Sequence, residues 1–286
     1  MSICYLNGEF LPLEQAKVPV LDRGFIFGDG VYEVIPVFHG QCFRLKEHLQ
    51  RLGNSLKAIG IDDPCTETEW SRLLATLIAR NGGDDQSLYL QITRGVAKRD
   101  HVLEIPLTPT VFAMTTRLET ASIPTPVSAI TCEDIRWKLC HIKAITLLPN
   151  VLLRQQAAAA GAYEAILIRE GQLTEGAASN VFIVSKGEIK TPPKGSALLP
   201  GITRDLVIAL LAQQDIPALE APIPEAELKA AEEIWLTSST REILPVIELD
   251  HIPVGSGRPG PIWQRVLALY QQFKREGFAG LKPAAS

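Results

Sequence analysis

Two neighbouring stretches, TEGAASNVF at residues 174–182 and LLPGITRD at residues 198–205, carry most of the information on fold and binding in this sequence. In the first stretch, Glu175 precedes a small-residue loop, 176–178, which would let a flat ligand approach the backbone closely. A buried carboxylate at that place would hold a protonated pyridine nitrogen. The same spacing also fits a solvated hairpin turn that follows Gly171.

The second stretch is a glycine turn that opens into a helix at about Ile202. Backbone N–H groups and the helix dipole make Ile202 and Thr203 suitable positions for an anion, with the Thr203 hydroxyl as a further donor. An ordinary capped helix also explains this pattern. Ser238 and Ser239 offer more hydroxyl groups at the end of a predicted strand, with the same two interpretations.

Lys143 lies in the largely apolar stretch WKLCHIKAITLLPN, residues 137–150. Burial disfavours the ammonium form of a lysine and lowers its pKa, and the neutral amine is the form that Schiff-base chemistry needs. A lysine with apolar neighbours also commonly extends its charge to water. These residues taken alone leave both interpretations open.

Two arginines also have two interpretations each. Arg51 lies one turn after Glu47 in a predicted helix, so it forms either a surface ion pair with Glu47 or a contact to a phosphate group. Arg99 and His101 stand two positions apart after a predicted strand. In an extended chain they would face the same side and bind one carboxylate together. A charged, exposed loop is the alternative.

The remaining pattern predicts a mixed α/β (α+β) chain with two domains. The segment Glu119–Pro126 contains two prolines and no periodicity, which is typical of a linker, so we place a small domain at 1–120 and a larger one at 121–286. Strands and helices are mixed in both halves, without the strict βαβ order of a dinucleotide-binding fold. Helices are predicted at 46–59, 67–80 and 149–161, from about residue 202 onward, and at 262–274. Short strands are predicted on both sides of an Asn7-Gly8 turn. Further strands are predicted at 31–38, 87–93, 110–116, 129–133, 163–168, 180–184, 188–191 and 233–237.

The composition narrows the class of protein. The formal net charge is −4 and basic residues are scattered among acids, which argues against a nucleic-acid partner. No apolar run approaches the roughly 18 residues of a membrane span, and the first residues do not resemble a secretory signal. The five cysteines are dispersed, which predicts reduced thiols and no metal site. We therefore expect a cytoplasmic globular enzyme or binding protein.

In their order along the chain, these stretches resemble the class IV (fold-type IV) aminotransferases, which depend on pyridoxal 5'-phosphate (PLP). The resemblance covers nearly the full length and implies a small N-terminal α/β domain, a larger C-terminal domain with a β-barrel-like core, and PLP between them. It makes Lys143 the Schiff-base lysine and Glu175 the partner of the pyridine nitrogen. The implied phosphate ligands are Arg51, Ile202, Thr203, Ser238 and Ser239, with Leu199 packed against the ring. The motifs that carry the resemblance are DRGFIFGDGVYEV (22–34), EHLQRL (47–52), DIRWKLCHIK (134–143), YEAIL (163–167), TEGAASNVF, LLPGITRD and TSSTREILPVIE (237–248).

Within the family, Tyr32 and the Arg-x-His pair are similar to the D-amino-acid transaminases. There, the residues matching Tyr32, Arg99 and His101 trap the substrate carboxylate, and the Arg and His come from the partner subunit. The resemblance therefore implies transamination between a D-alanine-like amino acid and a 2-oxo acid in a homodimer with shared active sites.

Three alternatives remain: a branched-chain L-amino-acid aminotransferase, an aminodeoxychorismate lyase, or a PLP-binding or structural protein that kept the fold. Branched-chain relatives and the lyases usually lack the Arg-x-His pair. The sequence also departs from the D-amino-acid transaminases, because Ala177 and Ala178 stand where those enzymes carry serines, and Pro200 and Arg241 are unusual. We expect these changes to affect rate and fine specificity and to leave the cofactor unchanged.

Overall fold

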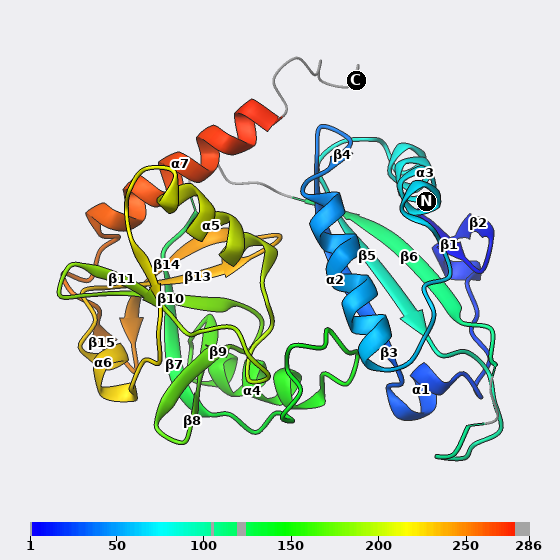
Figure 1. Cartoon of the computed structure of the whole chain (residues 1–286), viewed down its shortest axis with the longest axis horizontal. Helices are drawn as coiled ribbons and strands as arrows, with labels where there is room; N and C mark the ends of the chain where they lie inside the picture. The colour runs from blue at the N-terminus through cyan, green and yellow to red at the C-terminus, as the bar shows by residue number, and fades with distance from the viewer. Residues whose placement is uncertain (1, 104–105, 119–123, 278–286) are drawn as a thin grey trace. The chain divides into compact units, whose positions relative to one another are not determined.

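The first strands of the chain form the hairpin that the Asn7-Gly8 pair predicts. In the computed structural model, which describes residues 2–103, 106–118 and 124–277, both turn residues have positive φ (47° and 102°), as a two-residue hairpin turn requires. The hairpin forms one edge of an antiparallel sheet with the strand order β2-β1-β6-β5-β3-β4 (Figure 1). Its strands are β1 (Ile3–Leu6), β2 (Glu9–Pro12), β3 (Gly30–Phe38), β4 (Gln41–Cys42), β5 (Gln86–Thr93) and β6 (Thr110–Arg117).

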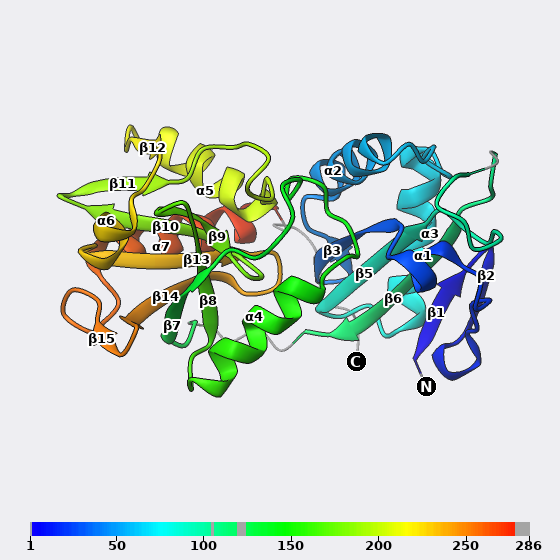
Figure 2. The same cartoon turned by 90° about the horizontal axis from the view of Figure 1, so that it is seen from below.

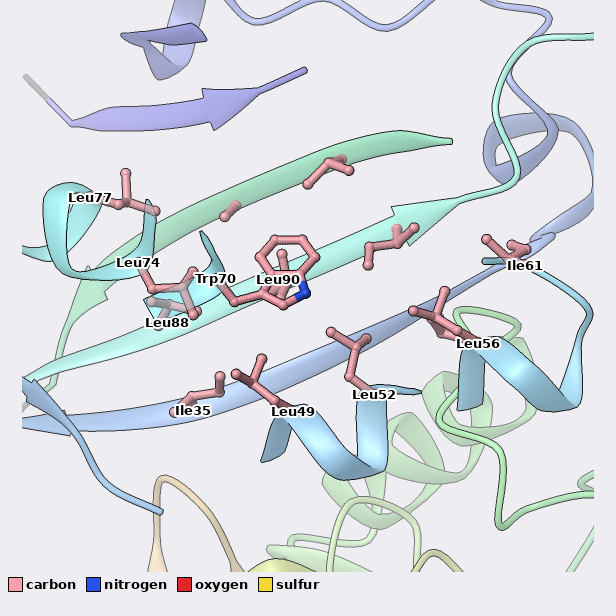
Figure 3. Close-up of a cluster of buried hydrophobic side chains, with 14 of the residues drawn as sticks. Ile35, Leu49, Leu52, Leu56, Ile61, Trp70, Leu74, Leu77, Leu88 and Leu90 are labelled. Atoms are coloured by element: carbon pink, nitrogen blue, oxygen red, sulfur yellow. The ribbon is translucent and has the colours of Figure 1, made fainter. Parts of the chain in front are cut away.

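Two helices, α2 (Leu45–Ala58) and α3 (Glu67–Arg80), pack on this sheet as their periodicity predicts. Helix α3 begins at a capping box, in which Thr66 Oγ1 accepts from the Glu69 N–H and the Glu69 carboxylate accepts from the Thr66 N–H. Apolar side chains of both helices point toward β3 and β5, with Trp70 in the middle of the cluster (Figure 3). A short 3-10 helix, η1 (Leu13–Gln15), and helix α1 (Arg23–Phe27) precede β3.

The second sheet mixes parallel and antiparallel neighbours and curls on itself. Its strand order is β12-β11-β10-β13-β14-β7-β8-β9, with β15 paired to β14. Strand β9 lies at one edge and yet contacts β10 near the other end of this order, so the sheet approaches a barrel. Its strands are β7 (Val127–Glu133), β8 (Glu164–Arg169), β9 (Gln172–Gly176), β10 (Asn180–Ser185), β11 (Glu188–Thr191), β12 (Ala218–Glu220), β13 (Glu233–Ser238), β14 (Glu242–Leu249) and β15 (Ile252–Pro253).

Helices cover this curled sheet. Helix α4 (Leu148–Ala159), with the predicted proline in its first turn, buries Leu153 and Ala157 against β7 and β8 (Figure 2). Helices α5 (Ile202–Ala212) and α7 (Pro261–Gly277) contact β13, and the short helix α6 (Glu225–Lys229) contacts β9.

The described residues divide into two compact units. The first consists of residues 2–118 and the segment Ile142–Thr146, and the second consists of residues 124–141 and 147–277. The predicted boundary at Ala121 and most of the predicted linker lie in 119–123, outside the described residues, so the boundary stays a prediction. The predicted mixed α/β fold class is confirmed. Within the described ranges, no helix combines the length and apolar character needed to cross a membrane.

Candidate functional site

Lys143 is held at the edge of β3 by a short extended segment. The Tyr32 N–H donates to the Lys143 carbonyl at 2.9 Å, and the Ile145 N–H donates to the Gly30 carbonyl at 3.1 Å. The Lys143 N–H donates to Ser55 Oγ, on α2, at 3.2 Å. The Lys143 side chain is half-buried, and its Nζ lies 4.2 Å from the centroid of the Tyr32 ring. The backbone thus fixes the lysine beside the tyrosine that the sequence predicts as its neighbour in the site.

Arg51 pairs with a buried carboxylate that the sequence analysis did not identify. Glu33 shares with its alternate residues Val31 and Ile35 the face of β3 that α2 covers. Its carboxylate accepts from Arg51 Nε and Nη2, both at 2.7 Å, and from His48 Nδ1 at 2.8 Å. Glu47 instead pairs with Arg44, so the predicted surface pair of Glu47 with Arg51 is wrong.

The charges of this cluster are set by burial and by one another. Burial alone would raise the pKa of Glu33, but the Arg51 guanidinium and the His48 hydrogen bond hold it well below its usual range. Burial lowers the pKa of His48, and the Arg51 charge adds to this against the raising effect of Glu33. At neutral pH the cluster is therefore a carboxylate and a guanidinium, with a neutral imidazole whose Nδ1–H donates to Glu33.

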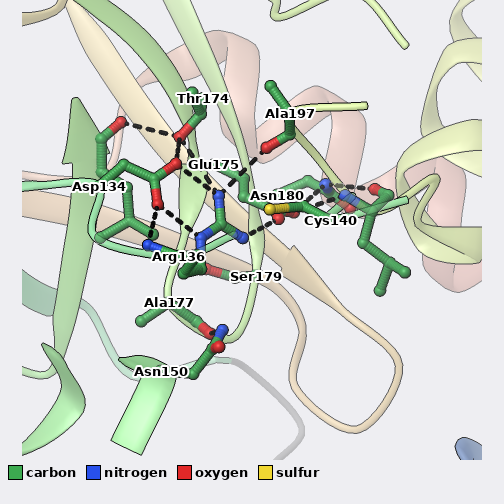
Figure 4. Close-up of polar contacts among 12 residues, drawn as sticks. Asp134, Arg136, Cys140, Asn150, Thr174, Glu175, Ala177, Ser179, Asn180 and Ala197 are labelled. Carbon is green, nitrogen blue, oxygen red and sulfur yellow. Dashed lines mark hydrogen bonds and ion pairs between the residues drawn. The ribbon is translucent and has the colours of Figure 1, made fainter. Parts of the chain in front are cut away.

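Glu175 occupies the end of β9 in a network of buried charges (Figure 4). Arg136 Nη1 donates to Glu175 Oε1, while Arg136 Nε and Nη2 donate to Asp134 at 2.9 and 2.8 Å. Thr174 Oγ1 also donates to Asp134, at 2.9 Å. The alternative of a solvated hairpin turn at Thr174 and Glu175 is wrong, because both residues are buried in a strand.

The second oxygen of the Glu175 carboxylate connects this network to the start of α5. Glu175 Oε2 accepts from the Leu199 N–H and from Asn180 Nδ2, both at 3.1 Å. Asn180 Nδ2 also donates to the Leu199 carbonyl at 2.9 Å. A Cβ at Gly201 would stand 1.9 Å from Asn180 Oδ1, so any other residue here would have to displace the Asn180 amide. Gly201 is the N-cap residue of α5, and as a glycine it offers no side chain to the first N–H groups, those of Ile202 and Thr203.

The predicted serines lie close to this helix start. Strand β10 pairs with β13 in a register that places Asn180 opposite Thr237, and β13 ends at Ser238. Asn180 therefore brings Gly201, at the start of α5, near the end of β13. Ser238 and Ser239 are half-buried, and Thr203 is buried. The second unit thus gathers Glu175, Leu199, Ile202, Thr203, Ser238 and Ser239 in one region.

The small-residue loop after Glu175 is fixed by neighbouring polar groups. Ala177 is buried, and its carbonyl accepts from Asn150 Nδ2 at 2.8 Å, as Figure 4 shows. Ser179 Oγ donates to the buried Glu164 carboxylate at 2.9 Å, while Ala178 is exposed. The loop 176–178 itself carries no hydroxyl, and the hydroxyl of the next residue, Ser179, is bound to Glu164.

Arg99 and His101 share one neighbouring ring, although not through strand alternation. The chain bends at Arg99 after leaving β5, and both side chains belong to an exposed loop. Their common neighbour is Phe27, whose ring centroid lies 5.5 Å from the Arg99 guanidinium carbon and 5.4 Å from the His101 ring centroid. The exposed-loop interpretation is thus correct for the backbone, and both side chains nevertheless contact the Phe27 ring.

The sequence analysis did not single out the residues that pair with Arg51 and Glu175: Glu33, His48, Asp134 and Arg136. Signals for them were present, because each lies inside a motif quoted for the resemblance. Glu33 is also a charged residue in an otherwise apolar strand, VYEVIPVF, a pattern that indicates a buried ion pair.

A profile of the family described as "Amino-transferase class IV" matches residues 30–249. The chain belongs to this family. It is 42% identical over 267 residues to the D-alanine aminotransferase of Bacillus licheniformis, with 93% of this chain and 94% of the relative covered. Among solved structures, it is similar to the branched-chain aminotransferase of Thermoproteus uzoniensis with norvaline, at a TM-score of 0.88 and 30% identity over 100% of both chains.

A second solved relative is a T.th. branched-chain amino acid aminotransferase with pyridoxamine 5'-phosphate, at a TM-score of 0.88 and 29% identity, with 98% of this chain and 97% of that one covered. Class IV aminotransferases use PLP. The predictions of the family and of an aminotransferase enzyme are confirmed.

Proposed function

We propose that this class IV aminotransferase carries PLP on Lys143 and transfers an amino group between a D-amino acid, D-alanine or a close analogue, and a 2-oxo acid. The observation that carries the proposal is the position of Lys143 Nζ, 4.2 Å from the ring of Tyr32. The amine that would react with PLP lies beside the residue expected to hold the substrate carboxylate. The 42% identity to a D-alanine aminotransferase supports the choice of substrate.

The described residues fit PLP in two respects. Glu175 lies against the permanently charged Arg136 guanidinium, which favours the ionised carboxylate that a protonated pyridine nitrogen needs. The start of α5 lacks a side-chain cap, so the N–H groups of Ile202 and Thr203 suit a phosphate group. Arg51, Ser238 and Ser239 would add donors to the phosphate, and Leu199 would pack against the ring. Bound PLP supplies an electron sink for the bonds at the substrate Cα.

The chain itself would contribute orientation and proton transfer. The Lys143 amine, once released by the incoming amino acid, would move a proton between the substrate Cα and the cofactor. Tyr32, Arg99 and His101 would hold the carboxylate, and its position decides which Cα–H bond faces Lys143 Nζ. D-selectivity therefore follows from the carboxylate trap and not from the lysine.

The test compares two lysines from the same stretch of sequence, Lys143 and the control Lys138. Purified protein is incubated with PLP, reduced with borohydride and mapped by mass spectrometry, and amino transfer from D-alanine, L-leucine and aminodeoxychorismate is measured. We expect a phosphopyridoxyl adduct on Lys143 and transfer from D-alanine. Lys143→Ala should abolish both, whereas Lys138→Ala, at an exposed position five residues earlier, should change neither. An unmodified Lys143 would refute the PLP site, and transfer from L-leucine but not D-alanine would refute the substrate.

We also propose that the protein is a homodimer with shared active sites and that it is located in the cytoplasm. Large apolar side chains are exposed in both units: Val20 (71%), Phe25 (76%) and Val102 (80%) in the first, and Leu148 (68%) on α4 in the second. A second copy of the chain would cover such surfaces. The five free cysteines suit a reducing compartment.

Mixing two variants, one without the lysine and one defective in carboxylate binding, tests the shared site. If Arg99 serves the partner's lysine, a heterodimer of a Lys143→Ala chain and an Arg99→Ala chain contains one site with both residues intact. After full exchange in an equal mixture, half of the dimers are heterodimers with one intact site each, so activity should return toward about a quarter of the wild-type level. No restoration, in a mixture whose exchange is verified by native mass spectrometry, would show that each chain completes its own site.

A further inference from the structure

Helix α1 anchors both ends of the loop that carries Arg99 and His101. The Asp22 carboxylate, fully buried, accepts from Thr93 Oγ1 at 3.0 Å and from Thr110 Oγ1 at 2.6 Å. These threonines are the last residue of β5 and the first of β6, so the N-cap residue of α1 ties the two stems of the loop together. A Cβ at Gly95 would stand 2.0 Å from the Thr108 carbonyl oxygen, which shows how closely the stems approach.

Arg23 fixes the backbone between Arg99 and His101. Its guanidinium is buried, and Nη1 donates to the carbonyl of Asp100 at 2.6 Å. Nε of the same guanidinium donates to Asp29 at 2.8 Å, and Asp29 also accepts from Arg94. Asp100 is the middle residue of Arg-x-His, so this contact sets the direction in which Arg99 and His101 leave the chain.

Phe27, the last residue of α1, supplies the surface on which these side chains lie. The guanidinium carbons of Arg23 and Arg99 lie 4.7 and 5.5 Å from the ring centroid, and the His101 ring lies at 5.4 Å. An aromatic face attracts cations and restricts their rotamers. Arg99 and His101 are otherwise exposed, so without the ring they would have to be ordered when the substrate binds.

We infer that Phe27 and Arg23 are positioning residues, which hold Arg99 and His101 ready for the substrate carboxylate. This inference rests on the proposed function, because it gives the pair its ligand. It goes further in assigning substrate affinity to residues that do not touch the substrate. Preorganisation of a charged pair lowers the cost of binding and leaves the proton transfer at Lys143 unaffected.

Phe27→Leu keeps an apolar side chain and removes the aromatic face, and it is the main test. We expect the KM for D-alanine to rise about 3- to 10-fold, while kcat changes less than twofold. Phe27→Trp should restore the wild-type KM. In the protein without PLP, trypsin should cleave after Lys98 and Arg99 faster in Phe27→Leu than in the wild type, a readout that needs no activity.

Phe10→Leu is the matched control, because Phe10 makes the same kind of contact, 4.5 Å from the guanidinium carbon of Arg80, away from the loop. It should leave KM and cleavage unchanged. The inference is overturned if Arg99→Ala raises KM and Phe27→Leu does not, or if Phe27→Leu loses kcat and PLP affinity together. If Arg99→Ala itself leaves KM unchanged, the proposed carboxylate site has failed and the inference with it, whatever Phe27→Leu does.

Discussion

Replacing Glu33 by Gln should strongly destabilise the protein, because Glu33 is the counter-charge of a buried arginine. The Glu33 side chain is 0% exposed and accepts three hydrogen bonds at 2.7, 2.7 and 2.8 Å, two of them from Arg51. Glutamine keeps the size but turns an amide toward these donors and leaves the guanidinium without its charge partner. Removal of one member of a buried ion pair costs about 3–5 kcal/mol in the free energy of unfolding.

The assay is urea unfolding of PLP-free protein at pH 7, so that cofactor binding does not contribute to stability. Glu47→Gln is the control, since Glu47 is the carboxylate one turn before Arg51 and pairs with Arg44 at the surface. A surface pair of this kind contributes roughly 0–1 kcal/mol. A Glu33→Gln/Arg51→Met double variant, which removes both charges, should recover more than about 1 kcal/mol relative to Glu33→Gln. Equal effects of Glu33→Gln and Glu47→Gln, or no recovery in the double variant, would refute the reasoning.

Three further predictions concern stability and the site. The pKa of His48 is lowered in the folded protein, so the unfolded state binds more protons below pH 6.5. The free energy of unfolding should therefore fall as the pH is lowered from there. His48→Asn should weaken this pH dependence, as measured by urea titrations at several pH values. Gly201→Ala should displace the Asn180 amide and lower the free energy of unfolding by about 1–3 kcal/mol. It should also weaken PLP affinity, measured by fluorescence titration. An unchanged affinity would show that Asn180 does not contribute to the cofactor site. Trp70→Ala should cost about 3–5 kcal/mol by the same unfolding assay, because the indole, carried by α3, is fully buried in the cluster between the two helices and the sheet. A loss below about 1 kcal/mol would contradict this packing.

Much of the fold could be predicted because its elements follow local rules. Helix α3 has both a capping box and an apolar stripe, and the predicted range 67–80 matches Glu67–Arg80. The β1–β2 hairpin follows from one Asn-Gly pair. Strands β9 and β14 were not predicted. Strand β9 is only five residues long and contains Thr174 and Glu175, whose burial depends on Arg136 and Asp134, from a distant part of the chain.

The candidate site shows the same contrast between residues that local patterns predict and residues that long-range contacts bring in. Lys143, Glu175 and the start of α5 were predicted as site residues from short stretches and from the order of the motifs, and these roles stay predictions. The partner of Arg51 was not, because helical spacing favours Glu47, whereas the tertiary structure brings Glu33 from another strand. Likewise, strand alternation predicted that Arg99 and His101 face one side, but the chain bends at Arg99, and both side chains instead contact Phe27. Pairings over long sequence distances depend on the assembled sheet and leave no local pattern.

The segment Ile142–Thr146 has a consequence for how the chain assembles during synthesis. It hydrogen-bonds to the edge of β3, although it follows by more than a hundred residues and is preceded by β7 of the second sheet. Gly30–Tyr32 pair with β5 on one side, but their other edge therefore lacks a strand-like partner until residue 146 has left the ribosome. A fragment that ends at 120 would expose this edge of β3, a feature that invites pairing with other chains. Expression of the two halves as separate proteins should thus favour aggregation of the first, and a split that respects the folded unit has to carry the lysine segment with the N-terminal half.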